Sequence, residues 1–160
     1  MFEKFGEFGS AEEINATAEG LKEEGDTESL YVMAKENGLE KEDVDDYLDG
    51  YTNELVNPLM AALGKIAVEE ENLKPKHIMV DWVNYIKTQC VEKEAVAISV
   101  RMRGKSIKGC IATILKYSFS IRAAVDKDIC SAAGINNARV DLGIPNAAKV
   151  KELIDTYYLG

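Results

Sequence analysis

The residues whose types and spacing suggest the most specific chemistry are four carboxylates at positions i, i+3, i+4 and i+7 of one segment: Glu42, Asp45, Asp46 and Asp49. A helix would place all four along one face, over roughly 10 Å of its axis. Because carboxylates at i and i+4 repel each other, such a stripe destabilises its helix slightly. One interpretation is a solvated face that keeps the protein soluble. The other is a row of carboxylates that replaces phosphates in the basic groove of a nucleic-acid enzyme, as a DNA mimic does.

Further acidic residues would extend the field of this stripe. Residues 1–50 contain 16 acidic and 4 basic side chains, a net charge of −12, whereas residues 51–160 contain 12 acidic and 15 basic ones, a net charge of +3. In the DNA-mimic interpretation, five carboxylates support the stripe: Glu12, Glu13, Glu23, Glu24 and Glu28. The net charge of the whole chain is −9. This charge disfavours direct nucleic-acid binding, because phosphate contacts dominate such affinity.

Basic residues are concentrated elsewhere in the chain. No acid occurs between Ala95 and Val125, and that segment holds six bases: Arg101, Arg103, Lys105, Lys108, Lys116 and Arg122. The sequence therefore predicts a molecule with one acidic and one basic part. A third interpretation of the acidic stripe follows, in which the acidic part docks on the basic 101–122 stretch within the same molecule.

Two motifs that could bind a nucleotide or DNA are present, one of them incomplete and the other with the wrong charge. Gly104, Lys105 and Ser106 match the end of a phosphate-binding loop, but Ser99 stands where that loop needs its first glycine. We interpret this segment as a helix break with a basic rim. Residues 34–44 match the frame of a helix-turn-helix motif. In that motif their carboxylates would lie against DNA phosphates, so binding to double-stranded DNA is disfavoured.

Metal-binding and catalytic patterns are also missing. Cys90, Cys110 and Cys130 form no CxxC pair, and His77 is the single histidine of the chain. The segment DVDDYLDG lacks the glycine and glutamate that a calcium loop requires. Because no base accompanies a Ser or Cys nucleophile, we expect no catalytic residue, no metal, no cofactor and no enzymatic activity.

The elements that would position these charges are helices. Apolar residues recur at helical spacing nearly throughout, and no alternating strand of useful length appears, which predicts an all-α fold. Ser10 with Glu13, Thr27 and Asn57-Pro58 are typical helix starts. We expect helices over residues 10–22, 27–36, 41–49, 57–68, 77–90, 95–102, 106–119 and 128–133, and one at the C-terminal end. Trp82 is predicted to anchor the core.

The chain divides by charge into an acidic three-helix lobe, residues 1–50, packed on a larger helical core, residues 51–160. No apolar run approaches the ~18 to 20 residues of a membrane span, and the first residues carry acids where a signal peptide has a basic region. A cytoplasmic protein without membrane contact is expected. The pattern indicates no particular oligomeric state.

Several segments resemble the PcfK-like family of conjugative plasmids and integrative elements. They are FEKFGEFGSAEEIN, EGDTESL, KENGLEKEDVDDYLDG and RGKSIKGCIATILKYS, and the most specific is the heptad from Gly104 to Cys110. The resemblance covers residues 1–120. Because residues 125–160 show no pattern of the family, the resemblance implies that they are a lineage-specific C-terminal extension. Some members of this group are anti-CRISPR proteins, which inhibit the type II RNA-guided nuclease. The family supplies no catalytic residue that could be carried over.

The resemblance implies a partner, the type II CRISPR effector nuclease, with or without its guide RNA. Such an effector holds nucleic acid in basic channels, so an acidic DNA-mimic surface could occupy one and block DNA binding. The alternative function is that of an accessory protein of a mobile element, which binds nucleic acid or a relaxosome partner through the basic face. Reversing the charge of each face would distinguish these two functions.

Overall fold

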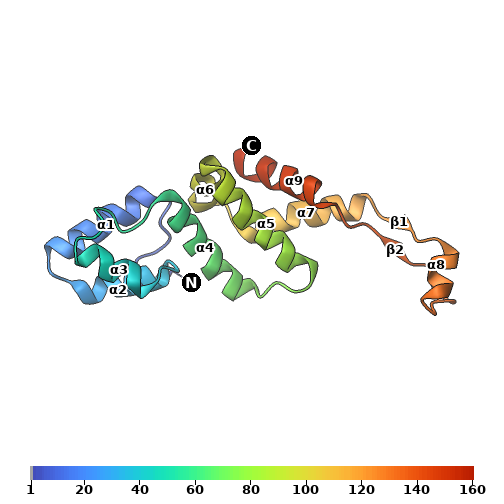
Figure 1. Cartoon of the computed structure of the whole chain (residues 1–160), viewed down its shortest axis with the longest axis horizontal. Helices are drawn as coiled ribbons and strands as arrows, with labels where there is room; N and C mark the ends of the chain where they lie inside the picture. The colour runs from blue at the N-terminus through green and yellow to red at the C-terminus, as the bar shows by residue number, and fades with distance from the viewer. Residues whose placement is uncertain (1) are drawn as a thin grey trace.

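The computed structural model describes residues 2–160, which form nine helices and one short two-stranded ribbon. α1 (Ala11–Glu23), α2 (Thr27–Glu36) and α3 (Lys41–Leu48) lie together at one end of an elongated molecule (Figure 1). α4 (Pro58–Leu73) leads into the centre, where it packs with α5 (Ile78–Glu92), α6 (Glu94–Arg101) and α7 (Ile107–Ser120). α9 (Ala147–Leu159) packs against α5, α6 and α7. β1 (Ala123–Ala124), α8 (Lys127–Ala132) and β2 (Asp141–Leu142) project from the other end (Figure 1).

The predicted all-α class is confirmed. The strands that accompany the helices are two residues long each and antiparallel, with Ala123 opposite Leu142 and Ala124 opposite Asp141. Strands this short have no room for an alternating apolar pattern, so they could not be predicted from the residue pattern.

Helix starts follow the capping residues closely. The Ser10 hydroxyl accepts a hydrogen bond from the Glu13 backbone N–H, and the Asn57 side chain begins α4 with Pro58 in its first turn. The prediction that Thr27 caps α2 was wrong: Asp26 is the N-cap, and its side chain accepts from the Ser29 N–H at 3.0 Å. Aspartate and threonine are both good caps, so adjacent ones leave the boundary ambiguous by one residue.

Buried apolar side chains form two clusters rather than one. The first joins α1, α2 and α3 to the start of α4 through residues such as Ile14, Met33 and Val44. The second surrounds Trp82, which is 3% exposed, and includes Val150 and Ile154 of α9. Since α9 belongs to this second cluster, the C-terminal helix is part of the core and not an appendage to it.

The two clusters meet where α4 passes the end of α2. Gly38, with φ +71°, and Gly64 face each other there, and a Cβ added to Gly38 would lie 2.2 Å from the Gly64 carbonyl oxygen. A Cβ on Gly64 would meet the Asn37 carbonyl oxygen at 2.3 Å. Both positions therefore need glycine for close backbone approach.

No helix within residues 2–160 combines the length and the apolar character that crossing a membrane requires.

Candidate partner-binding surface

The four carboxylates of the predicted stripe differ in their surroundings. Glu42, Asp46 and Asp49 are exposed, and none of them has an ion-pair partner within residues 2–160. Asp45 is half-buried instead, because it accepts from the Lys41 ammonium at 2.8 Å and from the Tyr31 hydroxyl. Hydrogen bonds from Lys41 and then Tyr31 lower the pKa of Asp45. Asp45 therefore stabilises the contact between α2 and α3, and three of the four stripe residues stay open to a partner.

The supporting carboxylates separate in the same way. Glu12, Glu23, Glu24 and Glu28 are exposed. Glu13 turns inward, where it accepts from the Gly9 N–H at 2.8 Å and from the Arg103 guanidinium at 2.7 and 3.1 Å. The Gly9 hydrogen bond and the Arg103 contact lower the pKa of Glu13. Glu13 is thus held by Arg103 in a surface ion pair and is not a free carboxylate.

The C-terminal ends of α1 and α3 meet through one lysine. The Lys22 ammonium donates to the Tyr47 carbonyl at 3.0 Å and lies 4.4 Å from the centre of the Tyr47 ring. Burial, followed by the nearby charges of Glu19 and Glu23, raises the pKa of Tyr47. Carboxylates of α1 therefore lie beside the last turn of α3.

Around this contact, exposed acids occupy the two helix ends. We call them the acidic end; its members are Glu19, Glu23, Glu24, Asp46 and Asp49. A helix C-terminus carries partial negative charge, so carboxylates there are unfavourable, whereas those at first turns, such as Glu12 and Glu28, are favourable. α3 has no basic residue in its last turn. The helix dipole therefore does not favour acids at these positions.

One aromatic residue of this surface was missed in the sequence. Tyr51 follows α3 directly and is 79% exposed. Tyrosine is enriched in protein interfaces because it offers apolar area and a hydroxyl together. An aromatic residue next to Gly50, outside any apolar periodicity, was the available signal.

The predicted basic face, in contrast, is partly engaged in contacts within the protein. Arg101 is 1% exposed and donates to the carbonyls of Phe8 (3.0 Å) and Ala61 (3.2 Å) and to the Asn37 side chain. Burial lowers its pKa to about 10. Arg101 is therefore a structural residue and forms no surface.

Its neighbours are also engaged. Arg103 binds the Glu7 carbonyl and Glu13, and the Lys105 ammonium donates to the Tyr157 carbonyl at 2.6 Å. Arg103, Lys108, Lys116 and Arg122 are exposed, and of these only Arg103 has an ion-pair partner within residues 2–160. The basic stretch thus splits into an inner part, residues 101–105, and an outer part on and after α7.

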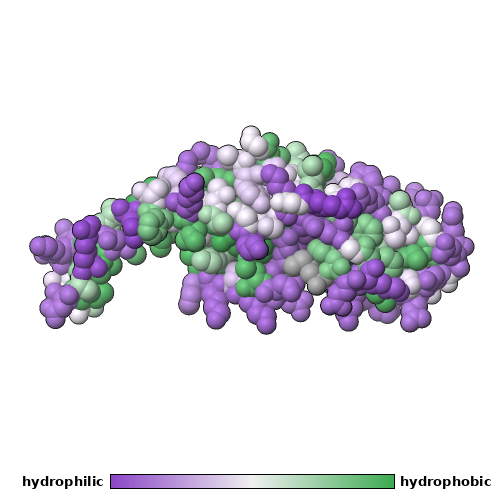
Figure 2. Space-filling view, turned by 180° about the vertical axis from the view of Figure 1, so that it is seen from behind, coloured by the Kyte–Doolittle hydropathy of each residue, from purple (hydrophilic) through white to green (hydrophobic). Residues whose placement is uncertain are grey.

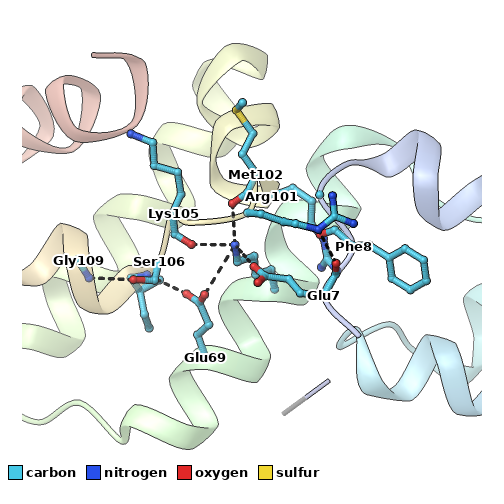
Figure 3. A network of polar contacts seen from close by, with 12 residues as sticks. Glu7, Phe8, Glu69, Arg101, Met102, Lys105, Ser106 and Gly109 are labelled. Carbon is cyan, nitrogen blue, oxygen red and sulfur yellow. Dashed lines mark hydrogen bonds and ion pairs between the residues drawn. The ribbon is translucent and has the colours of Figure 1, made fainter. Parts of the chain in front are cut away.

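A second buried cation lies close to the inner part. Lys65 is fully buried, and its ammonium donates to the carbonyls of Met102 (3.0 Å) and Lys105 (2.8 Å) and pairs with Glu7 at 2.8 Å (Figure 3). The Glu69 carboxylate lies 3.9 Å away. The α6–α7 turn and the N-terminal segment are therefore held to α4 by one side chain.

Glu69 also explains the partial phosphate-loop motif. Its carboxylate accepts from the Ile107 N–H at 2.8 Å, at the first turn of α7 and next to Ser106 (Figure 3). A carboxylate of the chain itself thus lies at the helix N-terminus where a phosphate would bind in a nucleotide-binding loop. The interpretation of this segment as a helix break with a basic rim agrees with these contacts.

The remaining candidate groups lie apart from this surface. The three cysteines are buried and unpaired, and burial raises the pKa of the Cys90 and Cys110 thiols to about 12. His77 is exposed before α5. Across the part of the chain that the structure describes, no three His, Cys, Asp or Glu side chains are grouped as metal ligands.

Comparisons of the chain with protein-family models, with curated proteins and with solved structures gave no match.

Proposed function

We propose that this protein binds a type II CRISPR effector nuclease and inhibits it, with the acidic end occupying a basic channel that otherwise holds nucleic acid. The carrying observation is the placement of exposed carboxylates at two helix C-termini, where they oppose the helix dipole and have no ion-pair partner within residues 2–160. Charges that weaken a fold slightly are retained where a complementary surface uses them.

Two further features support this proposal. The segments EGDTESL and KENGLEKEDVDDYLDG, which carry much of the resemblance to the PcfK-like family, contain Glu24, Asp46 and Asp49 of the acidic end. Tyr51 adds an exposed aromatic side chain next to these charges. A basic channel lined by arginine would contact both the carboxylates and the ring.

The alternative, a mobile-element accessory protein that uses its basic face, has less support. Arg101, Arg103 and Lys105 are bound within the protein, so only Lys108, Lys116 and Arg122 of that set are available to a phosphate backbone. Three phosphate contacts give weak, salt-sensitive binding.

The experiment reverses three charges of the acidic end, Glu23→Lys, Asp46→Lys and Asp49→Lys, and measures affinity for the guide-loaded effector. We expect the affinity to fall at least about tenfold, since each complementary charge is replaced by a repulsive one. A matched variant, Glu71→Lys, Asp81→Lys and Glu94→Lys, changes the net charge equally at exposed positions of α4, α5 and α6.

The matched variant should bind like the unmodified protein. Binding of the unmodified protein should also weaken with added salt, because exposed charges interact over a Debye length of only ~8 Å at physiological ionic strength. An effector already loaded with target DNA should bind the unmodified protein more weakly than the same effector without target DNA. Equal losses in both triple variants would reduce the proposal to an effect of net charge and refute it.

A further inference from the structure

Residues 121–145 form an arm that has almost no core of its own. It consists of β1, α8, β2 and their connections, and only Cys130 and Pro145 are buried within it. The arm projects away from both hydrophobic clusters (Figure 1). A two-stranded hairpin alone is marginally stable in water. Its ordered conformation therefore requires a surface to pack against.

Large apolar side chains are exposed along this arm and on the part of α7 next to it. Six of them are between 42% and 62% exposed: Leu115, Phe119, Ile129, Ile135, Leu142 and Ile144. Hydrophobic surface is visible along the arm and at its base in Figure 2. Apolar surface that is gathered in this way, rather than scattered singly, is typical of an interface.

The total surface of the chain has the same implication. The solvent-accessible area is 9488 Å², whereas a compact monomer of this mass exposes about 7,900 Å². The excess of about 1,600 Å² is twice the area of about 800 Å² that one partner contributes to an interface of standard size. An interface of standard size formed by the arm would remove about half of this excess.

The charge of the arm indicates which kind of molecule would pack against it. The arm contains three bases (Arg122, Lys127 and Arg139) and three acids (Asp126, Asp128 and Asp141). The arm is therefore neutral, so it does not complement a nucleic acid or a highly charged protein. A two-fold contact places each surface against its own copy, which suits a patch that carries both signs equally. The acidic end lies at the opposite end of the molecule, so pairing through the arms keeps the two acidic ends apart.

We infer that two copies of this chain associate through residues 121–145 and the exposed side of α7 that carries Leu115 and Phe119. The inference does not depend on the effector as partner.

Sedimentation equilibrium of the full chain at micromolar concentration tests this inference. The unmodified protein should have twice the 17.6 kDa mass of one chain. The variant Ile129→Glu, Leu142→Glu should raise the dissociation constant at least about tenfold, because it buries two charges at the contact. The control Val80→Glu, Val91→Glu changes two exposed valines of α5 equally and should stay dimeric. A monomeric unmodified protein, a dimeric arm variant or a dissociated control would each overturn the inference.

Amide hydrogen exchange on the unmodified protein tests it without any variant. When the concentration is raised through the dissociation constant, exchange should slow within residues 121–145. Slowing within residues 11–49 instead would assign the contact to the acidic end and refute the arm as interface.

Discussion

Two charged stretches of opposite sign, residues 42–49 and residues 101–105, have opposite places in the fold. In the first, Glu42, Asp46 and Asp49 are exposed. In the second, Arg101 is buried, and Arg103 and Lys105 are bound to other parts of the chain. The difference lies in what surrounds each set of charges, because Arg101 lies between the two hydrophobic clusters whereas Glu42, Asp46 and Asp49 lie on the exposed side of their segment.

The surroundings of a charged stretch determine what its charged side chains bind. Between two apolar clusters, a guanidinium supplies several donors to backbone carbonyls that would otherwise be buried without partners. At the exposed end of α3, by contrast, Asp46 and Asp49 have no ion-pair partner within residues 2–160. Exposed carboxylates of the first stretch are therefore available to a partner, and the inner bases of the second are not.

Removal of the buried cation should have the largest effect on stability. Arg101→Ala leaves the carbonyls of Phe8 and Ala61 and the Asn37 side chain without their donor. We expect the free energy of unfolding to fall by about 3–5 kcal/mol, as for other broken buried charge networks. Urea denaturation measures it.

The neighbouring arginine provides the control. Arg103→Ala removes an exposed ion pair with Glu13, so the free energy of unfolding should fall by only about 0.2–1 kcal/mol. Similar small losses in both variants would contradict a structural role for Arg101.

A smaller effect should depend on pH through Glu69. Burial is the main cause that raises the pKa of Glu69 above its ordinary 4.5, so the folded protein keeps this proton at pH values where the unfolded chain has lost it. Stability then falls as pH rises through the interval above 4.5, up to the pKa in the folded protein. Glu69→Gln keeps an acceptor for the Ile107 N–H and has no titrating proton.

Relative to Glu69→Gln, the unmodified protein should therefore lose stability between about pH 4 and about pH 7. Unfolding free energies of both proteins at the two pH values give the difference. A relative gain with rising pH would mean that Lys65 and Arg101 outweigh burial at this carboxylate.

Charge reversal at the acidic end should affect stability least, and in the opposite direction. Asp46→Lys with Asp49→Lys places cations at the end of α3, where the helix dipole favours them. We expect stability to rise by about 0.3–1 kcal/mol, measured by thermal unfolding. A clear loss of stability would show that these carboxylates serve the fold and that the two stretches are alike.

Many helix boundaries could be predicted from the sequence, because helix caps and helix breaks depend on a few neighbouring residues. Asn57-Pro58, Ser106 and Gly104 mark helix boundaries through their own backbone and side-chain preferences. The acidic stripe was also located correctly on a helix, although the roles of Asp45 and Glu13 depend on Tyr31 and Arg103, which come from distant parts of the chain.

The buried cations could not be assigned from charge alone, but their spacing held a signal. Arg101 lies on the buried side of α6 with Val96, Ala97 and Val100, and Lys65 continues the face of Ala61, Ala62 and Ile66. A basic residue in phase with an apolar stripe therefore indicates a buried, hydrogen-bonded cation. The carbonyls that receive it are set by tertiary packing, which no local pattern contains.

The most direct test compares the two charged faces in one assay of target-DNA cleavage by the effector. One variant carries Glu23→Lys, Asp46→Lys and Asp49→Lys, and the other carries Lys108→Glu, Lys116→Glu and Arg122→Glu, so that each reverses three exposed charges. The acidic-end variant should need at least about tenfold more protein for half-inhibition, with unchanged or higher thermal stability, and the basic variant should inhibit normally. Full inhibition by the acidic-end variant together with loss in the basic variant would contradict the assignment of the acidic end as the binding surface.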